Sequence, residues 1–221
     1  WSAPSLALLL IPAALTAQRP VPYTPGMIVT ASTRIAPGQY RIPSGDSVGI
    51  IVRGTNVTLD LRGVELVGDT TRSRPDQFSG MGILVVGGSQ VTVRGATVRG
   101  VKHGLVARGT HGLRLLDSDF SYNQKPRLYS GIEKESLVDW LSFHRNEKQE
   151  WLRFGAGVYL DGVTGGEIRN VTVRQGMNGL MLNRTDSLLI WNSDFSYNSG
   201  LGIGMYRSSH NRIVHNKVDW N

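Results

Sequence analysis

Residues 118–123 are Ser-Asp-Phe-Ser-Tyr-Asn, and residues 193–198 are the same six residues in the same order. A second pattern, glycine followed by an aliphatic residue, recurs at spacings of 22, 53, 22 and 23 residues. Its members are Gly82-Ile83, Gly104-Leu105, Gly157-Val158, Gly179-Leu180 and Gly202-Ile203. The 53-residue interval is one 22-residue unit with 31 extra residues, and the 75-residue offset between the hexapeptides is that interval plus one unit. A single register therefore explains both patterns and indicates an internal repeat.

Within each unit, apolar residues alternate with polar ones over stretches of three to five residues, as at Ile83 and Val85. This alternation is typical of short strands that bury one face. The same register aligns two apolar columns: Val93, Leu115, Ile168, Ile190 and Ile213, and Val98, Phe120, Val173, Phe195 and Val218. Such short strands bury a face only when successive units stack at about 4.8 Å. The sequence predicts an all-β, right-handed parallel β-helix with coils of about 22 residues.

Residues 49–66 repeat the pattern of residues 82–98, and residues 27–42 provide the opening strands. Over residues 27–221 the chain resembles the secreted bacterial right-handed parallel β-helix repeat proteins. This group includes pectate-lyase-like, alginate-epimerase-like and periplasmic copper-binding β-helix proteins. The resemblance implies the fold but not an activity, because this scaffold carries lyases, hydrolases, epimerases and plain binding proteins.

The chain has 221 residues, with 27 Gly and no Cys. The glycine content excludes a helical bundle as the main architecture. The lack of cysteine excludes a disulfide scaffold, cysteine-based zinc sites and thiol catalysis.

The first 17 residues contain the apolar run Leu6 to Ala14, which is broken by Pro12. This run is typical of the remnant of a secretory signal peptide, and a buried strand or a membrane anchor is the alternative. Residues 18–26 are polar and proline-rich, which favours a linker before the β-helix of residues 27–221. We expect export to the periplasm or beyond, no membrane span in the mature chain, and further coils after Asn221.

Residues 124–156 form the one long insertion in the repeat. Leu137, Trp140, Leu141 and His144 recur at helical spacing, which predicts a helix that ends at Gly155. An inserted helix on a regular solenoid serves either as the wall of a binding groove or as a cover for apolar surface on the flank.

The hexapeptides provide the candidate catalytic residues. The register suggests that Asp119 and Asp194 stack in neighbouring coils, where one pKa of a close carboxylate pair would rise. The pair would then serve as acid and base, with His144 as a further catalytic candidate, or would share a divalent cation such as calcium. No other cofactor is evident, and no metal ligands are assigned. The alternative is that these polar residues satisfy backbone groups at the turns.

The aromatic and cationic residues nearby are candidates for substrate binding. Tyr122 and Tyr197 would form a platform for sugar rings, and Arg127, Trp140 and Arg153 of the insertion would form the adjacent wall. The formal net charge of +7 and the pairs Arg94 with Arg169 and Arg99 with Arg174 favour an acidic polysaccharide as partner. Nucleic acid is disfavoured because the chain appears exported, and solvated arginines on an outer strand face are the alternative interpretation.

The sequence lacks a Walker loop, a His-Glu-x-x-His motif and the catalytic boxes of alginate epimerases and polygalacturonases. We therefore expect an exported protein that binds or processes an acidic polysaccharide, by lyase, epimerase or hydrolase chemistry if it is an enzyme. The alternative is a non-catalytic scaffold of the cell envelope. A copper-related role is disfavoured because the five His are dispersed.

Overall fold

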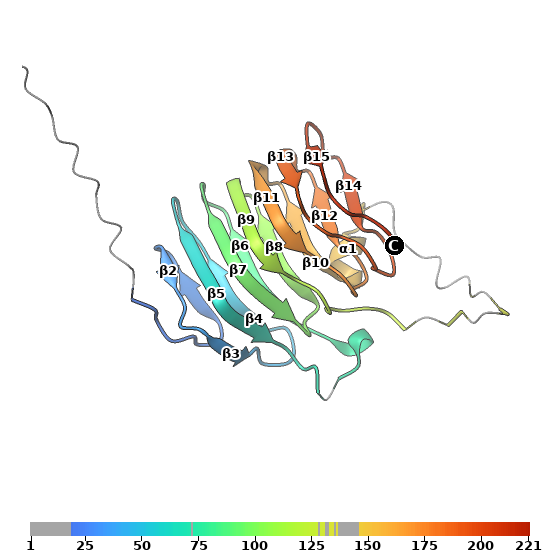
Figure 1. Cartoon of the computed structure of the whole chain (residues 1–221), viewed down its shortest axis with the longest axis horizontal. Coiled ribbons are helices and arrows are strands. Elements are labelled where there is room, and N and C mark those ends of the chain that lie inside the picture. The colour runs from blue at the N-terminus through green and yellow to red at the C-terminus, as the bar shows by residue number, and fades with distance from the viewer. Residues whose placement is uncertain (1–18, 72, 128, 131–132, 135, 137–145) are drawn as a thin grey trace, which may run out of the picture.

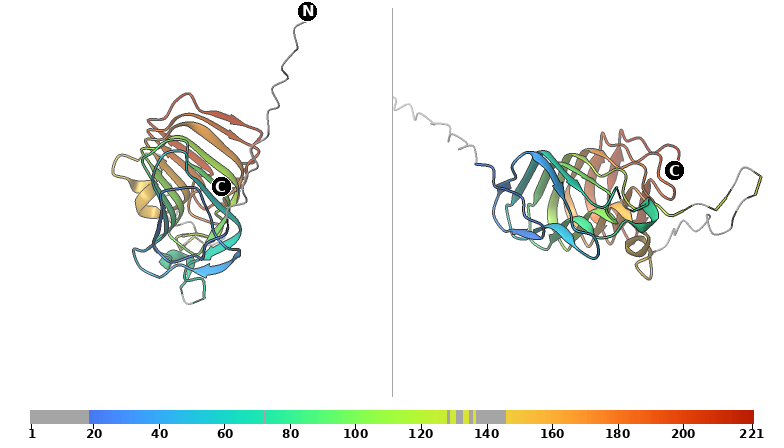
Figure 2. Two further views of the ribbon diagram at one scale, coloured as in Figure 1. Left: turned by 90° about the vertical axis from the view of Figure 1, so that its left-hand side faces the viewer. Right: turned by 90° about the horizontal axis from the view of Figure 1, so that it is seen from below.

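The computed structural model describes residues 19–71, 73–127, 129–130, 133–134, 136 and 146–221. In this part of the chain, the strands form two parallel sheets, which we call sheet I and sheet II, and each coil contributes one strand to each sheet. Coils follow one another along the long axis in sequence order (Figure 1). The end-on view in Figure 2 shows the coils superimposed around one interior. The predicted all-β parallel β-helix is confirmed.

Sheet I consists of β1 (Met27–Val29), β4 (Val48–Val52), β6 (Met81–Val86), β8 (His103–Arg108), β10 (Ala156–Asp161), β12 (Leu180–Asn183) and β14 (Ile203–Tyr206). Sheet II consists of β2 (Thr33–Arg34), β5 (Thr58–Val67), β7 (Thr92–Arg99), β9 (His111–Asp119), β11 (Thr164–Thr172), β13 (Asp186–Trp191) and β15 (Arg212–Val214), and β3 (Gly38–Arg41) also pairs with β5. A short 3-10 helix, η1 (Pro75–Gln77), lies in the loop before β6.

The core consists of the predicted aliphatic columns. Val93 pairs with Leu115, Leu115 with Ile168, and Ile168 with Ile190, and all four side chains are fully buried. The two hexapeptides are two coils apart, because Thr172 pairs with both Asp119 and Asp194. Our expectation of adjacent hexapeptides is therefore wrong: the intervening coil carries no copy of the motif, and it places Thr172 between the two aspartates.

The recurring Gly-aliphatic pattern has a packing cause. A Cβ atom on Gly82 would lie 2.3 Å from Val98 Cγ1 and 2.5 Å from the Gly104 carbonyl oxygen. On Gly157 it would lie 2.0 Å from Val173 Cγ1. The glycines thus leave room for the large apolar residues of the second column, which fill the corner between sheet II and sheet I.

The insertion leaves the repeat after Asn123 and rejoins it at Ala156, the first residue of β10. Its helix α1 (Glu150–Phe154) ends at Gly155, as the sequence predicts. Trp151 of α1 is buried against Val106, Tyr159 and Met181. Helix α1 therefore covers apolar side chains of sheet I. Figure 2, viewed along the coil stack, shows the α1 ribbon lying on the outside of the coils. The rest of the predicted helix, 137–145, lies outside the described residues.

The N-terminal segment takes part in the first coil. Val21 donates its backbone N–H to the Arg34 carbonyl at 2.8 Å, and Tyr23 is 9% exposed against Tyr40. Residues 19–26, expected to form a linker, thus pack on the body of the protein. The expected leader, 1–17, lies outside the described residues.

Candidate functional site

One corner of the β-helix carries exposed aromatic residues in an unusual backbone conformation. At the turn from sheet II to sheet I, successive coils place Gly100, Tyr122, Gln175 and Tyr197 in one column, and Trp220 of the next coil continues it. All five residues have a positive φ, between 56° and 72°. Backbone hydrogen bonds join the coils here, from Gly100 N–H to the Tyr122 carbonyl and from Gln175 N–H to the Tyr197 carbonyl. Glycine suits this left-handed region, and a bulky residue there costs about 1 kcal/mol or more.

The tyrosine side chains at this corner are accessible. Tyr122 is 39% exposed and Tyr197 is 50% exposed. The Phe78 ring meets the Tyr122 ring edge-on at 5.8 Å between centroids, so the loop before β6 supports the upstream end of the column. We call the column Tyr122, Gln175 and Tyr197 the aromatic corner. It runs parallel to the helix axis over about 10 Å, the rise of two coils.

Arg174 lies beside the aromatic corner and is fixed by two contacts. Its guanidinium nitrogen is 3.0 Å from Asp194 Oδ2, and its Cζ atom lies 5.0 Å from the centroid of the Tyr197 ring. The Arg174 side chain is 40% exposed, whereas its Nε atom is buried and has no hydrogen-bond partner among the described residues. A positioned, partly exposed guanidinium next to an aromatic ring can donate to the hydroxyl or carboxylate groups of a sugar.

The two predicted catalytic aspartates are not brought together. Thr172 lies between Asp119 and Asp194, so the two residues are about 10 Å apart along the axis rather than one strand spacing. Each carboxylate caps its own turn: Ser121 N–H donates to Asp119 at 2.9 Å, and Ser196 N–H donates to Asp194 at 3.0 Å. The expected close pair, whether as acid and base or as joint ligands of a cation, is therefore wrong in its geometry.

The expected stripe of like charges is also broken. Leu116 lies between Arg94 and Arg169, because it pairs with both. Carboxylates neutralise most arginines of sheet II: Arg94 is 2.8 Å from Asp60, and Arg114 and Arg169 are both 3.3 Å from Glu167.

The carboxylate of Asp60 accepts hydrogen bonds from two of these arginines, and its pKa reflects both. Burial alone would raise the pKa of the Asp60 carboxyl, but hydrogen bonds from Arg62 and Arg94 outweigh burial and hold the pKa well below its usual range. Most arginines of sheet II are therefore paired with the protein's own carboxylates.

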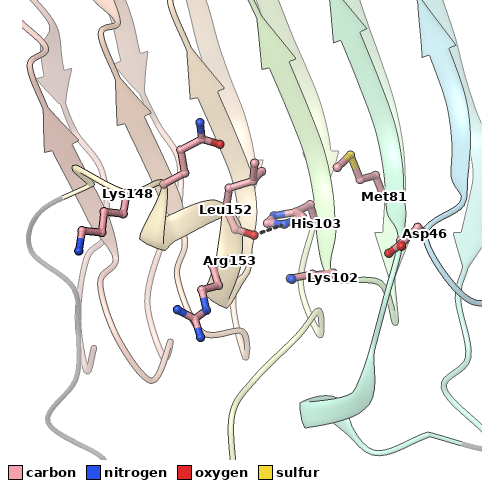
Figure 3. A pocket seen from close by; sticks show the side chains of 9 residues that line it. Asp46, Met81, Lys102, His103, Lys148, Leu152 and Arg153 are labelled. Carbon is pink, nitrogen blue, oxygen red and sulfur yellow. Dashed lines mark hydrogen bonds between the residues drawn. The ribbon is translucent and has the colours of Figure 1, made fainter.

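A cavity of about 440 Å³ lies between α1 and the N-terminal ends of β6 and β8. Three cationic side chains line it: Lys102 from the coil, and Lys148 and Arg153 from the insertion (Figure 3). In the part of the chain that the structure describes, none of the three forms an ion pair. Asp46 on the opposite side is the one carboxylate in the lining. The cavity therefore carries a net positive charge.

The inner lining of this cavity is neutral. Met81 and Leu152 contribute apolar surface, and His103 is 1% exposed. His103 Nε2–H donates to the Leu152 carbonyl at 2.9 Å, and Ala156 N–H donates to His103 Nδ1 at 3.3 Å. These partners fix the neutral tautomer. Burial, reinforced by the charge of Lys102, lowers the pKa of His103 to about 4.

A comparison with protein families agrees with this architecture. Residues 81–221 match the family model described as the right-handed β-helix region. The chain belongs to the right-handed β-helix family. This family is compatible with polysaccharide-processing proteins and with surface proteins. No curated protein and no solved structure matches the chain.

Two further features of this β-helix protein concern the described residues only. Within them, no helix is both long and apolar enough to cross a membrane. Their His, Asp and Glu side chains form no cluster of three or more that could hold a metal ion.

The remaining predicted site residues are divided between the cavity and the insertion. Arg153 lines the cavity, whereas the Arg127 guanidinium lies 5.7 Å from the centroid of the Tyr129 ring. Trp140 and His144 lie outside the described residues. Tyr122 and Tyr197 share the aromatic corner, although Gln175 separates them.

Sequence reasoning missed Gln175, Lys102, Lys148 and His103 as candidate site residues. The register contains a signal for two of them. Gln175 follows Tyr122 by 53 residues, which is one unit plus the insertion, and Lys102 comes two residues after Gly100, the corner residue of its own coil. Lys148 had no such signal, because it lies in the insertion, which does not follow the repeat.

Proposed function

We propose that this chain is an exported glycan-binding protein that holds an extended sugar chain along the aromatic corner. In this proposal the glycan runs parallel to the helix axis. Its rings stack on Tyr122 and Tyr197, while Arg174 and Gln175 donate hydrogen bonds to its oxygen atoms. The distance between the two tyrosines, about 10 Å, is comparable to the length of a disaccharide unit in an extended chain.

The observation that carries the proposal is the placing of exposed tyrosines at left-handed backbone positions. Glycine takes the equivalent position in the preceding coil, so the fold itself does not require a tyrosine there. Left-handed residues also occur at other turns of this β-helix, such as Gln90 and Asn192, so the exposed rings at these positions, rather than φ alone, point to a ligand. Exposed rings with one polar end are also suited to stacking on sugars, which are apolar on one face and hydroxylated at the edge.

An acidic glycan is the favoured ligand. The chain carries a formal net charge of +7, and among the described residues no carboxylate forms an ion pair with Lys102 or Arg153 of the cavity beside α1. We propose binding without turnover, because the two aspartates that would act as acid and base lie in separate coils, where each accepts a hydrogen bond from the backbone of its own turn.

The test replaces Tyr197 with glycine. Glycine tolerates the φ of 61° at this position, so Tyr197→Gly should fold with a stability within about 1 kcal/mol of the parent. Loss of one stacking ring should weaken binding about tenfold, by analogy with an aromatic contact of about 1.5 kcal/mol. Affinities are measured by calorimetry and by gel retardation against alginate, pectate, hyaluronan and a neutral glucan.

Gln90→Gly is the matched control, because Gln90 is also exposed with a φ of 53° but lies at a different corner. It should leave binding unchanged. If no acidic glycan binds, or if both glycine variants bind as well as the parent, the glycan-binding proposal is wrong. A non-catalytic scaffold for a protein partner then becomes the better interpretation.

A further inference from the structure

The cavity between α1 and sheet I has a composition that the aromatic corner does not explain. Its cations come from two separate segments: Lys102 from the coil, and Lys148 and Arg153 from the insertion. In Figure 3, the side chain of Lys102 lies between those of Arg153 and Asp46. Like charges gathered at one opening repel each other unless solvent or an anion compensates them.

Sheet II is arranged differently from this cavity. On sheet II, arginines are paired with Asp60, Glu167 and Asp194 at distances of 2.6 to 3.3 Å. At the cavity, Lys102, Lys148 and Arg153 face no carboxylate within ion-pair distance among the described residues. An excess of positive charge is thus concentrated where there is also space for a ligand.

The inner lining indicates what kind of ligand fits. His103 is neutral, and both of its ring nitrogens are occupied by the Leu152 carbonyl and the Ala156 N–H. It therefore offers neither charge nor a free donor to the ligand, and Met81 and Leu152 add apolar surface. A cavity of about 440 Å³ with a neutral interior and a cationic rim is suited to a small anion or to a compact ligand with one anionic group.

We propose that this cavity binds an oxyanion, a carboxylate, sulfate or phosphate group, between Lys102 of the coil and Arg153 of the insertion. The bound anion would join the two segments and so stabilise the packing of α1 on sheet I. The inference goes beyond the proposed function, because the cavity is separate from the aromatic corner and the oxyanion can be a free ion or a substituent of a sugar.

The full chain is titrated at pH 7 and low ionic strength with sodium sulfate, sodium phosphate and sodium glucuronate, using calorimetry. We expect saturable binding with a dissociation constant of about 1 mM, typical of a few partly solvated charges. Lys102→Gln and Arg153→Gln should each weaken binding about threefold to fivefold. Asp46→Asn should strengthen binding about twofold, because it removes the one repelling carboxylate.

Arg53→Gln is the matched control, since Arg53 is an exposed cation just after β4 that does not line the cavity. It should leave binding unchanged. If glucuronate binds more tightly than sulfate and phosphate, the result supports the site and indicates that the oxyanion belongs to a sugar. Equal or tighter binding of the inorganic ions would support it with a free ion.

Two results would overturn the inference: no saturable binding of any of the three anions, or equal binding by the parent, Lys102→Gln and Arg153→Gln. The gain expected for Asp46→Asn cannot arise from misfolding, so it keeps the test decisive if a cationic variant folds poorly. Tyr197→Gly should bind the oxyanion normally, which separates a failure of this site from a failure of the aromatic corner.

Discussion

At Gly82 the β-helix has no space for a side chain. A Cβ atom there would meet both Val98 and the Gly104 carbonyl, so Gly82→Ala should lower the free energy of unfolding by about 1 to 3 kcal/mol. Gly176→Ala is the control, because its Cβ atom would find only ordinary contacts at 3.6 Å and beyond. Urea denaturation measures both. Equal losses in the two variants would contradict the packing reason given for the Gly-aliphatic pattern.

The second core column gives a prediction at the same scale. Phe195 is fully buried at the corner, so Phe195→Ala should cost about 3 to 5 kcal/mol through the cavity it leaves. Arg212→Ala, an exposed change on neighbouring β15, should cost less than about 0.5 kcal/mol. Similar unfolding midpoints for the two variants in urea would show that the column does not point inward.

The sequence predicts core residues well and site residues less well, for a physical reason. Alternation and a fixed period determine which side chains point inward, and Val93, Leu115 and Ile168 stack as the register indicates. To predict which surface residues are neighbours, every coil must be counted, because a coil without a copy of the motif can separate two coils that carry it. Because the hexapeptide recurs, the sequence predicts that Asp119 and Asp194 are neighbours, but Thr172 of the intervening coil lies between them.

At the scale of elements, α1 is held to the coil through His103, which gives a pH dependence. The pKa of His103 is about 4 in the folded chain, whereas the ordinary value is 6.5. The unfolded chain therefore takes up this proton first, and the free energy of unfolding should fall as the pH falls from about 6.5 to about 4. The loss should be about 3 kcal/mol over this window.

Denaturation at several pH values measures this effect, and His103→Gln should remove the slope. The lowered pKa of Asp186, caused mainly by its hydrogen bond from the Ser209 backbone, removes stability only in more acidic solution, below its ordinary value of 3.8. The pKa of Asp60 is also lowered and likewise acts only in more acidic solution, so among the described groups with a shifted pKa the window above pH 4 reports on His103. A parent protein whose stability stays constant from pH 6.5 to pH 4.5 would contradict the buried, neutral assignment.

The end of α1 at Gly155 was predictable, because its φ of 92° suits glycine after a helix. The cavity beside α1 was not. It depends on where the insertion returns to the coil stack, and repeat periodicity carries no information about a segment outside the repeat. The register gives no signal for the buried His103, since its partners in the neighbouring coils are the apolar residues Met81 and Ala156.

At the scale of the whole molecule, local ion pairs neutralise much of the charge of sheet II, whereas Lys102, Lys148 and Arg153 at the cavity form no ion pair with any residue that the structure describes. Raising NaCl from about 0.02 M to about 0.5 M should weaken binding of an acidic polysaccharide about tenfold, because exposed charges are screened. Stacking on the aromatic corner is uncharged, so any binding of a neutral glucan should change less than about twofold. Calorimetry at the two salt concentrations gives the comparison. Equal salt dependence for both polymers would contradict the division between stacking and charge.

The most direct test of the aromatic corner is a crystal structure of the chain with a bound acidic oligosaccharide. Our account predicts sugar rings over Tyr122 and Tyr197, with the oligosaccharide parallel to the helix axis and Arg174 within hydrogen-bond distance of it. An oligosaccharide bound elsewhere, such as across the outer face of sheet II, with the aromatic corner empty, would contradict the account.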